Sequence, residues 1–299
     1  MNKLLRRWLA VRVAVTEANP HEIFLLDAQL QVALQTQLSA LQKELRERTP
    51  GNPAADGFKA YSQADEDGII EAIMERLGIH EGRFLEVGTG DGRENNTHYL
   101  LLKGWRGAWV DGDQASMDRA RASLGARTGR LALHCAMVNR DNILAVAQDA
   151  LRTSGVGPEL DFLSVDIDGN DLQVCIPLVQ TYSPSVVCVE YNAKMRPPLK
   201  ISVHYNADHI WSGDDYQGSS LSAWTDVLCD RYVLVSCSLS GCNAFFVRSD
   251  LAAVFPRYSE RELYQPARYH LAALRSGHSP STKFLQAELA GESPKEQTR

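Results

Sequence analysis

The chain of 299 residues is 44% hydrophobic and 23% charged, which is typical of a soluble globular protein that buries a full hydrophobic core. Its formal net charge of −6 argues against nucleic acid as the main partner, because phosphate recognition requires clustered Lys and Arg. The six cysteines are scattered without CxxC spacing, so neither a zinc site nor a disulfide framework is indicated. No apolar run reaches the roughly 18 residues of a membrane span. We therefore expect a cytoplasmic protein.

The first 55 residues are predicted to form a helical extension. Residues 3–13 mix Lys and Arg with Leu, Trp and Val, which indicates a basic amphipathic helix suited to peripheral contact with a membrane. From Glu22 to Arg48 the chain has no Gly or Pro, and apolar residues recur at steps of three or four, so one long helix is expected. Its apolar stripe would pack either on the core or on a second copy of the chain in a homodimer, and it consists of Ile23, Leu26, Leu30, Leu34, Leu38, Leu41 and Leu45.

Residues 56–257 are predicted to form one α/β domain, and the polar residues 258–299 a helical or disordered tail. Apolar strand-like runs alternate with amphipathic segments, which is typical of a doubly wound, Rossmann-like sheet with helices on both faces. The last two runs, 232–236 and 243–247, are separated by a short loop and should pair as an antiparallel hairpin. The sheet should therefore be mostly parallel and seven-stranded, whereas a dinucleotide-binding sheet is parallel throughout. The other expected strands are 84–87, 107–110, 131–138, 162–165 and 185–189, and the expected helices include 68–77, 115–124 and 143–151.

A glycine-rich turn, Gly-Thr-Gly-Asp-Gly at residues 88–92, follows the first predicted strand. Its glycines allow the backbone to turn tightly and to approach a ligand closely. A helix that begins just after the turn would direct its N-terminal N–H groups toward that ligand. S-adenosylmethionine (SAM) suits this arrangement, because an acid can accept from its amino group and N–H donors can bind its carboxylate. The expected cofactor contacts in this region are Glu86, Gly88, Gly90, Asp91 and Asn96.

The second predicted strand ends in Val110-Asp111-Gly112-Asp113, about 20 residues after the turn, where a carboxylate can accept hydrogen bonds from both ribose hydroxyls. The turn and the acid together predict a cofactor that contains adenosine. NAD also fits these residues, but GxGxG spacing in place of GxGxxG, the acid in the turn and the predicted hairpin favour SAM. We expect Asp111 to bind the ribose and Met137, near the end of the third strand, to complete the cofactor site.

Acidic residues follow the fourth and fifth predicted strands. Because the carboxyl ends of parallel strands meet at one edge of a sheet, Asp166, Asp168 and Glu190 should converge there, together with Asn192. One carboxylate, with its pKa raised by like charges, could remove the proton from a substrate hydroxyl. Alternatively, two or three of them could hold Mg²⁺, although no residue is assigned as a dedicated metal ligand. Asp171 is expected to have a structural role as a cap.

A long polar and aromatic connection spans residues 202–220 and is expected to build the acceptor site. His204 and His209 are both candidates for a general base, and His204 is selected alongside the carboxylates. Aromatic side chains on this connection would stack on the faces of a sugar, and they are Tyr205, Trp211 and Tyr216.

Five segments in order resemble the FkbM-like group of SAM-dependent methyltransferases. The resemblance implies a class I methyltransferase fold and methyl transfer to oxygen on a small-molecule or glycan acceptor, often a sugar or a secondary metabolite. It also implies SAM contacts at Glu86, Gly88, Gly90 and Asp111. Many relatives have a Glu-Pro-like pair where this chain has Asp-Gly-Asp, so Asp111 and Asp113 both remain candidates for the ribose. The matching segments are 61–68, 86–92, 104–107, 164–171 and 241–248.

Two other functions remain open at the level of the sequence. Asp166-Ile167-Asp168 is a DxD sequence, which metal-dependent glycosyltransferases use to hold a nucleotide sugar. A non-catalytic adapter would keep the same fold and act through its N-terminal helix. Binding of SAM or of a nucleotide sugar separates the glycosyltransferase from the methyltransferase hypothesis, and biological activity that survives substitution of Asp111 by Ala would favour the adapter.

Overall fold

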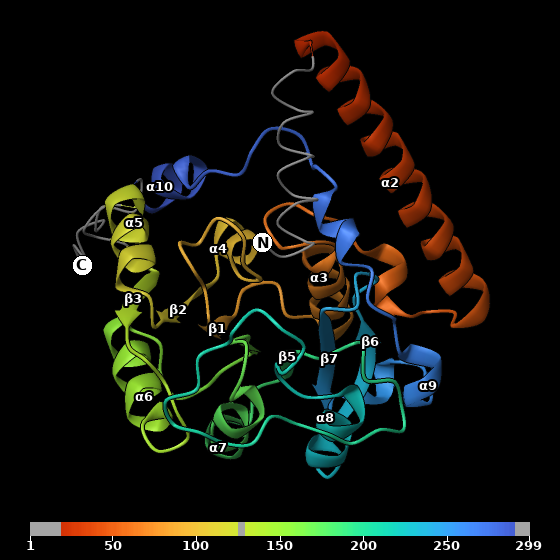
Figure 1. The fold of residues 1–299 in the computed structure, drawn as a ribbon. Coiled ribbons are helices and arrows are strands. Elements are labelled where there is room, and N and C mark those ends of the chain that lie inside the picture. The colour runs from red at the N-terminus through yellow and green to blue at the C-terminus, as the bar shows by residue number, and fades with distance from the viewer. Residues whose placement is uncertain (1–18, 125–128, 291–299) are drawn as a thin grey trace.

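The computed structural model describes residues 19–124 and 129–290. The basic segment predicted to be helical at residues 3–13 and the chain after residue 290 lie outside the described residues. A seven-stranded sheet with the order β3-β2-β1-β4-β5-β7-β6 forms the centre of the molecule, with helices on both faces (Figure 1). β1 to β5 pair in parallel, and β7 lies antiparallel between β5 and β6. The predicted doubly wound, mostly parallel seven-stranded sheet is thus confirmed.

Each predicted strand forms, and all except β3 are buried at their centre. β3 ends earlier than predicted, because residues 136–138 leave the sheet. β6 and β7 form the predicted hairpin, with a register shift between Leu234 and Ser236. The strands are β1 (Arg83–Val87), β2 (Arg106–Asp111), β3 (Leu131–Cys135), β4 (Phe162–Val165), β5 (Val186–Glu190), β6 (Tyr232–Cys237) and β7 (Asn243–Arg248).

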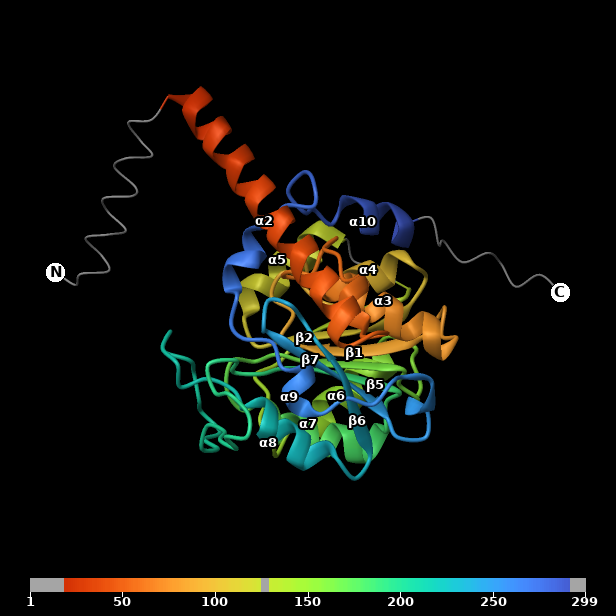
Figure 2. The ribbon, with the colours of Figure 1, turned by 90° about the vertical axis from the view of Figure 1, so that its right-hand side faces the viewer.

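The helices divide between the two faces of the sheet, and each set buries its own hydrophobic cluster (Figure 2). One face carries α6 (Ile143–Thr153), α7 (Asp171–Tyr182), α8 (Leu221–Leu228) and α9 (Glu260–Leu263). The other face carries α2 (Pro20–Arg48), α3 (Glu66–Leu77), α4 (His98–Leu102), α5 (Gln114–Leu124) and α10 (Lys283–Ala290). The described residues also form three short 3₁₀ helices, η1 (Pro53–Asp56), η2 (Ala252–Val254) and η3 (Tyr269–Ala273).

The long predicted helix is α2, and only its second half packs on the sheet domain. It begins at a capping box in which Asn19 and Glu22 satisfy each other's backbone N–H groups. Leu34, Leu38 and Leu45 are buried, in one cluster with residues of α3 and of the tail helix α10. The first half of α2 extends beyond the body of the molecule (Figure 2). None of the helices in the described ranges combines the length and apolar character needed to cross a membrane.

Candidate functional site

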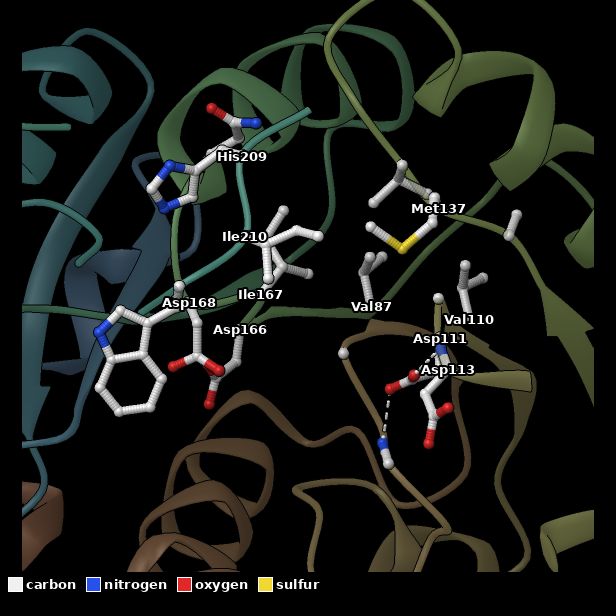
Figure 3. A pocket seen from close by; sticks show the side chains of 17 residues that line it. Val87, Val110, Asp111, Asp113, Met137, Asp166, Ile167, Asp168, His209 and Ile210 are labelled. Carbon is white, nitrogen blue, oxygen red and sulfur yellow. Dashed lines mark hydrogen bonds between the residues drawn. The ribbon is translucent and has the colours of Figure 1, made fainter. Parts of the chain in front are cut away.

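A cavity of about 520 Å³ opens at the carboxyl ends of β1, β2, β3 and β4 (Figure 3). Residues that follow each of these four strands line it, and a segment of the long loop after β5, residues 209–211, closes one side. Asp111 and Asp113 lie at one end of the cavity, and Asp166 and Asp168 lie at the other. Ligands of doubly wound sheets bind at this edge. The site therefore forms where the sequence predicts it.

The turn after β1 depends on Gly88, which has a positive φ of 89°. A Cβ at this position would overlap the backbone carbonyl oxygen of Asp166, so only glycine fits. The N–H of Gly88 donates to the carbonyl of Val110 at 2.8 Å, and the N–H of Asp166 donates to the carbonyl of Val87 at 2.9 Å. These main-chain contacts join the ends of β1, β2 and β4 at the floor of the cavity.

Asp111 presents its carboxylate to the cavity from the end of β2. One oxygen accepts a hydrogen bond from the N–H of Gly90 at 2.7 Å, and the other accepts from the N–H of Asp113 at 2.7 Å. Each carboxylate oxygen retains a further acceptor position. The side chain is therefore held in one orientation while it can still bind a pair of hydroxyl groups.

Asp113 also borders the cavity, but its carboxylate caps α5. It accepts hydrogen bonds from the N–H of Ala115 at 3.2 Å, from the N–H of Ser116 at 3.0 Å and from the hydroxyl of Ser116 at 2.6 Å. The hydrogen bonds from Ser116 lower the pKa of Asp113. Of the two acids that the sequence leaves open for the ribose, Asp111 keeps a free acceptor position on both oxygens, whereas Asp113 keeps one on Oδ1 alone.

Between the two acidic ends the cavity is apolar (Figure 3). Val87 and Val110 form its floor, and Met137 lies above them, in the segment where the chain has left β3. A Cβ at Gly112 would overlap the sulfur of Met137, so the glycine makes room for that side chain. The slot between Met137 and Val110 suits a flat, apolar ligand group such as a purine.

Glu86 and Asn96 do not line the cavity, although both are expected there as cofactor contacts. The buried carboxylate of Glu86 accepts from the amide of Asn95 at 2.9 Å and from the N–H groups of Asn96 at 2.8 Å and Thr97 at 3.1 Å. The hydroxyl of Thr97 also donates to it, at 2.5 Å. Burial raises the pKa of Glu86 to about 7, against these four hydrogen bonds, which lower it. In this structure Glu86 holds the start of α4.

Asp91 is the third expected cofactor contact that the structure places outside the lining. Its carboxylate lies 3.4 Å from Arg119 and 3.7 Å from Arg93, on the outer side of the turn. These ion pairs account for the absence of Asp91 from the lining of the cavity. The sequence shows an acid in the glycine-rich turn but does not show that Arg119 and Arg93 lie beside it.

His98 supports the glycine turn from below and is not indicated by any pattern in the sequence. Its Nδ1 donates to the carbonyl of Gly92 at 2.7 Å, and its ring stacks on Tyr61 with centroids 3.8 Å apart. Burial lowers the pKa of His98 to about 4, so the ring stays neutral. Trp109 packs against Gly92 so closely that a Cβ there would overlap its ring.

Asp166, Asp168 and Glu190 converge at the other end, with one carboxylate oxygen from each lying within 4.8 Å of the others. This convergence confirms the prediction from the ends of β4 and β5. Burial, followed by repulsion from neighbouring carboxylates, raises the pKa values of Asp166 and Glu190 well above the ordinary range. Burial also raises the pKa of Asp168. Gln217 donates a hydrogen bond to Glu190 and orients it. The cluster therefore combines a tendency to accept a proton with a donor set of three carboxylates.

Two nearby polar residues have structural roles. Asp171 is fully buried and accepts from the N–H groups of Ile167 and Gly169, each at 2.7 Å. Its predicted structural role is confirmed, although it holds the loop before α7 and does not cap the helix. Asn192 does not join the cluster, because its amide donates to the carbonyls of Asp215 and Gln217 at 3.0 and 3.1 Å.

The long loop after β5 brings His209, and not His204, to the cavity. His204 is exposed and outside the lining, whereas His209 packs so closely on Gly169 that a Cβ there would overlap its ring. The amide of Asn170 donates to the carbonyl of Asn206 at 2.7 Å and anchors the loop beside the cavity. His209, Ile210 and Trp211 follow this anchor. The selection of His204 as a site residue is therefore corrected.

No family model and no curated protein matches the chain. Among solved structures, an O-methyltransferase from Bacillus cereus in complex with SAH is matched at a TM-score of 0.42 and 14% identity, over 72% of this chain and 100% of that chain. A putative O-methyltransferase from Klebsiella pneumoniae is matched at 0.40 and 18%, over 72% of this chain and 99% of that chain. The glycopeptide N-methyltransferase MtfA complexed with sinefungin is matched at 0.38 and 12%, over 64% and 87%. These likenesses concern the fold alone, so the function must be inferred from the cavity.

Proposed function

We propose that this protein is a SAM-dependent methyltransferase that transfers a methyl group to a hydroxyl oxygen. One observation carries the proposal. The carboxylate of Asp111, held by the N–H of Gly90, stands at one end of an apolar slot whose other end is a cluster of carboxylates. The first end suits the ribose of an adenosine cofactor, and the second suits an acceptor hydroxyl that must lose a proton.

The donor would lie along the cavity from Asp111 toward Asp166. Its ribose hydroxyls would donate to Asp111, and its adenine would occupy the slot beside Met137. A volume of about 520 Å³ is in the range of small-molecule sites. The methionine part would lie along Gly88 and Gly90, where the backbone borders the cavity without side chains.

The same residues argue against NAD. A dinucleotide needs free N–H groups at the start of the helix after the turn to bind its pyrophosphate. Here the N–H groups of Asn96 and Thr97 already donate to Glu86. A buried carboxylate thus occupies the place that a pyrophosphate would require.

The proposed reaction is a direct displacement at the methyl carbon. A lone pair of the acceptor oxygen forms the new C–O bond while the C–S bond breaks, and its electron pair returns to sulfur. The products are the methyl ether and S-adenosylhomocysteine, and the hydroxyl proton passes to a carboxylate, for which we propose Asp168. The main contribution of the protein is to hold the two reactants in line.

The carboxylate cluster also fits a divalent cation. Asp166, Asp168 and Glu190 would supply the oxygen ligands that Mg²⁺ prefers. A bound cation would orient the acceptor hydroxyl and lower its pKa. Asp168 would then be a ligand, and loss of activity in a chelator distinguishes this form of the mechanism.

A sugar or glycosylated intermediate is the proposed acceptor. Ile210 is 79% exposed and Trp211 42% exposed, yet both line the cavity next to Asp168. An exposed indole beside carboxylates suits a ring with an apolar face and several hydroxyl groups. Acceptor candidates of this class would be tested by mass spectrometry for the addition of one methyl group.

Titration calorimetry with SAM and with S-adenosylhomocysteine tests the cofactor assignment. We expect both to bind the purified protein, and we expect Asp111→Asn to weaken both. The second candidate function, glycosyl transfer, rests on the adjacent Asp166 and Asp168. Binding of a nucleotide sugar with Mg²⁺ or Mn²⁺, without any binding of SAM at millimolar concentration, would replace the methyltransferase proposal with this one. Biological activity that persists in Asp111→Ala would instead favour the adapter.

A further inference from the structure

The first half of α2 is an apolar helix that the described residues leave largely uncovered. Phe24 is 67% exposed, Leu26 63% and Val32 66%. This part of the helix extends away from the sheet domain (Figure 2). Leu34 is the first residue of α2 that the body of the molecule buries. The exposed apolar residues therefore begin at Ile23, about three helical turns before Leu34, where burial against the body of the molecule begins.

The apolar residues occupy two sides of this half of the helix. Phe24, Leu25 and Val32 lie on one side, and Ile23, Leu26 and Leu30 lie on the other. Polar residues separate the two sides. Glu22, Gln29 and Thr36 form one polar line, and Asp27 and Gln31 form a second, which binds Arg275 and the carbonyl of Ala273. A helix that is apolar on two sides is stabilised when other elements cover them.

The exposed area is close to that of a specific interface. If a large apolar side chain presents about 200 Å² when fully exposed, the six exposed side chains from Ile23 to Val32 present about 650 Å² in total. Each partner in a stable interface buries about 800 Å². The side that carries Phe24, Leu25 and Val32 would supply about 360 Å² of this on each copy, and the residues around the neighbouring hollow would add to it.

The charge of the helix selects the partner. α2 has no Lys or Arg from Pro20 to Gln42, and its acids in this range are Glu22 and Asp27. Asp27 is neutralised within the chain by Arg275 at 2.8 Å. An anionic lipid surface would require basic residues around the apolar face. A neutral, glutamine-rich helix instead suits another helix of the same composition.

We propose that the first half of α2 forms a homodimer with the same segment of a second copy of the chain. In an antiparallel pair centred near Ala28, Phe24 of each copy would lie opposite Val32 of the other, as two-fold symmetry requires. Val32 borders a hollow of about 700 Å³ that Leu274 and Gly277 also line. This hollow provides room for a large side chain from the second copy.

The dimer is independent of the proposed methyl transfer and is tested by the mass of the full chain in solution. Light scattering should give twice the chain mass of 33.1 kDa. Phe24→Asp and Val32→Asp, both on the paired face of the helix, should each raise the dimer dissociation constant at least about 100-fold, because each places two unpaired carboxylates in the interface. Gln29→Asp adds the same charge on the polar line and should leave the mass unchanged.

Because Phe24 and Val32 are mostly exposed within one chain, their substitution should not unfold it, and the thermal midpoint and SAM affinity check this. A monomeric wild-type chain overturns the proposal, whether the helix is then covered by residues 1–18 or by a bilayer. A dimer that survives both substitutions overturns it as well. Binding of the wild type to vesicles of phosphatidylcholine and phosphatidylglycerol, with a monomer in solution, would identify the bilayer as the partner.

Discussion

The carboxylate of Asp111 and the backbone N–H of Gly90 are joined by a hydrogen bond of 2.7 Å between the ends of adjacent strands. The bond couples the two sequence features that most clearly suggest a cofactor, a glycine turn and an acid about 20 residues later. It keeps the carboxylate oriented before a ligand arrives, so little conformational freedom is lost on binding.

Asp111→Asn should raise the dissociation constant for SAM by about 10- to 100-fold. The amide keeps the shape of the side chain but loses the charge that strengthens hydrogen bonds from two hydroxyl groups. Asp113→Ala is the matched variant, because Asp113 caps α5 and has no free role in the cavity. It should lower the thermal midpoint while the affinity changes less than about threefold. Equal affinities for the wild type and Asp111→Asn in calorimetry would refute the ribose assignment.

The two glycines of the turn should respond differently to alanine. Gly88→Ala forces a Cβ into the main chain at Asp166 and should cost about 3 kcal/mol or more of unfolding free energy. A Cβ at Gly90 meets open space, so Gly90→Ala should cost only the about 1–2 kcal/mol of a left-handed backbone. Its methyl group should nevertheless weaken SAM binding at the cavity wall. Denaturant unfolding measures the stabilities, and calorimetry measures the affinities for SAM. Similar stabilities of the two variants would contradict the close approach of Gly88 to the main chain of Asp166.

The rate of methyl transfer should rise with pH beyond the ordinary range of carboxyl groups. Burial raises the pKa of Asp168, the proposed base, and burial with mutual repulsion raises the pKa values of its neighbours Asp166 and Glu190, so the cluster keeps protons at a pH where an exposed carboxylate has none. A base acts only after it has lost its proton, so kcat should increase with pH through the raised pKa and then level off. Asp168→Asn should lower kcat by about 10²- to 10⁴-fold and leave SAM affinity unchanged. A flat pH profile in the wild type would exclude a carboxylate base.

The stability of the fold should decrease as pH rises through the range set by Glu86. The pKa of this carboxyl is 4.5 for an ordinary glutamate and about 7 in the folded protein. As the pH rises, the unfolded chain therefore loses this proton at a lower pH than the folded chain does. Folding is therefore favoured most below pH 4.5, and about 3 kcal/mol is lost by the time the pH passes 7. Glu86→Gln should flatten this part of the curve, whereas the exposed Glu75→Gln should not. Parallel curves of unfolding free energy against pH for the wild type and Glu86→Gln would be the contrary result.

Trp211→Ala should affect the acceptor and not the donor. The indole lines the cavity on the acceptor side, so its loss should raise the KM for the acceptor by about tenfold or more. The affinity for SAM should remain within about threefold. Phe284→Ala removes an exposed aromatic ring on α10 that does not line the cavity, and it should change neither constant. If Trp211→Ala instead weakened the affinity for SAM, the indole would contact the donor and not the acceptor.

Much of the fold follows from local patterns in the sequence. Buried parallel strands are continuous apolar runs, so β1, β2, β4 and β5 are recognisable from their composition. The short loop before Asn243 predicts the hairpin, because two strands so close in sequence pair antiparallel. The convergence of Asp166 and Glu190 follows from the same parallel topology.

The parts that could not be predicted depend on contacts between distant residues. Glu86 lies on a strand beside the cavity, but the donors of Asn95 to Thr97 determine where its carboxylate points. The choice between His204 and His209 depends on an irregular loop that is anchored through Asn170. Neither the orientation of Glu86 nor the position of His209 follows from a periodicity or a spacing in the sequence.

The close approach of Gly88 to the main chain of Asp166 has a consequence for how such a protein can diversify. This approach is made by the main chain alone, and it fixes the spacing between the turn that borders the proposed donor and the strand end that leads to Asp168. Side chains on the loop after β5 can then be exchanged without altering that spacing. Evolution toward new acceptors would proceed by replacing residues around Trp211, while this spacing is inherited unchanged.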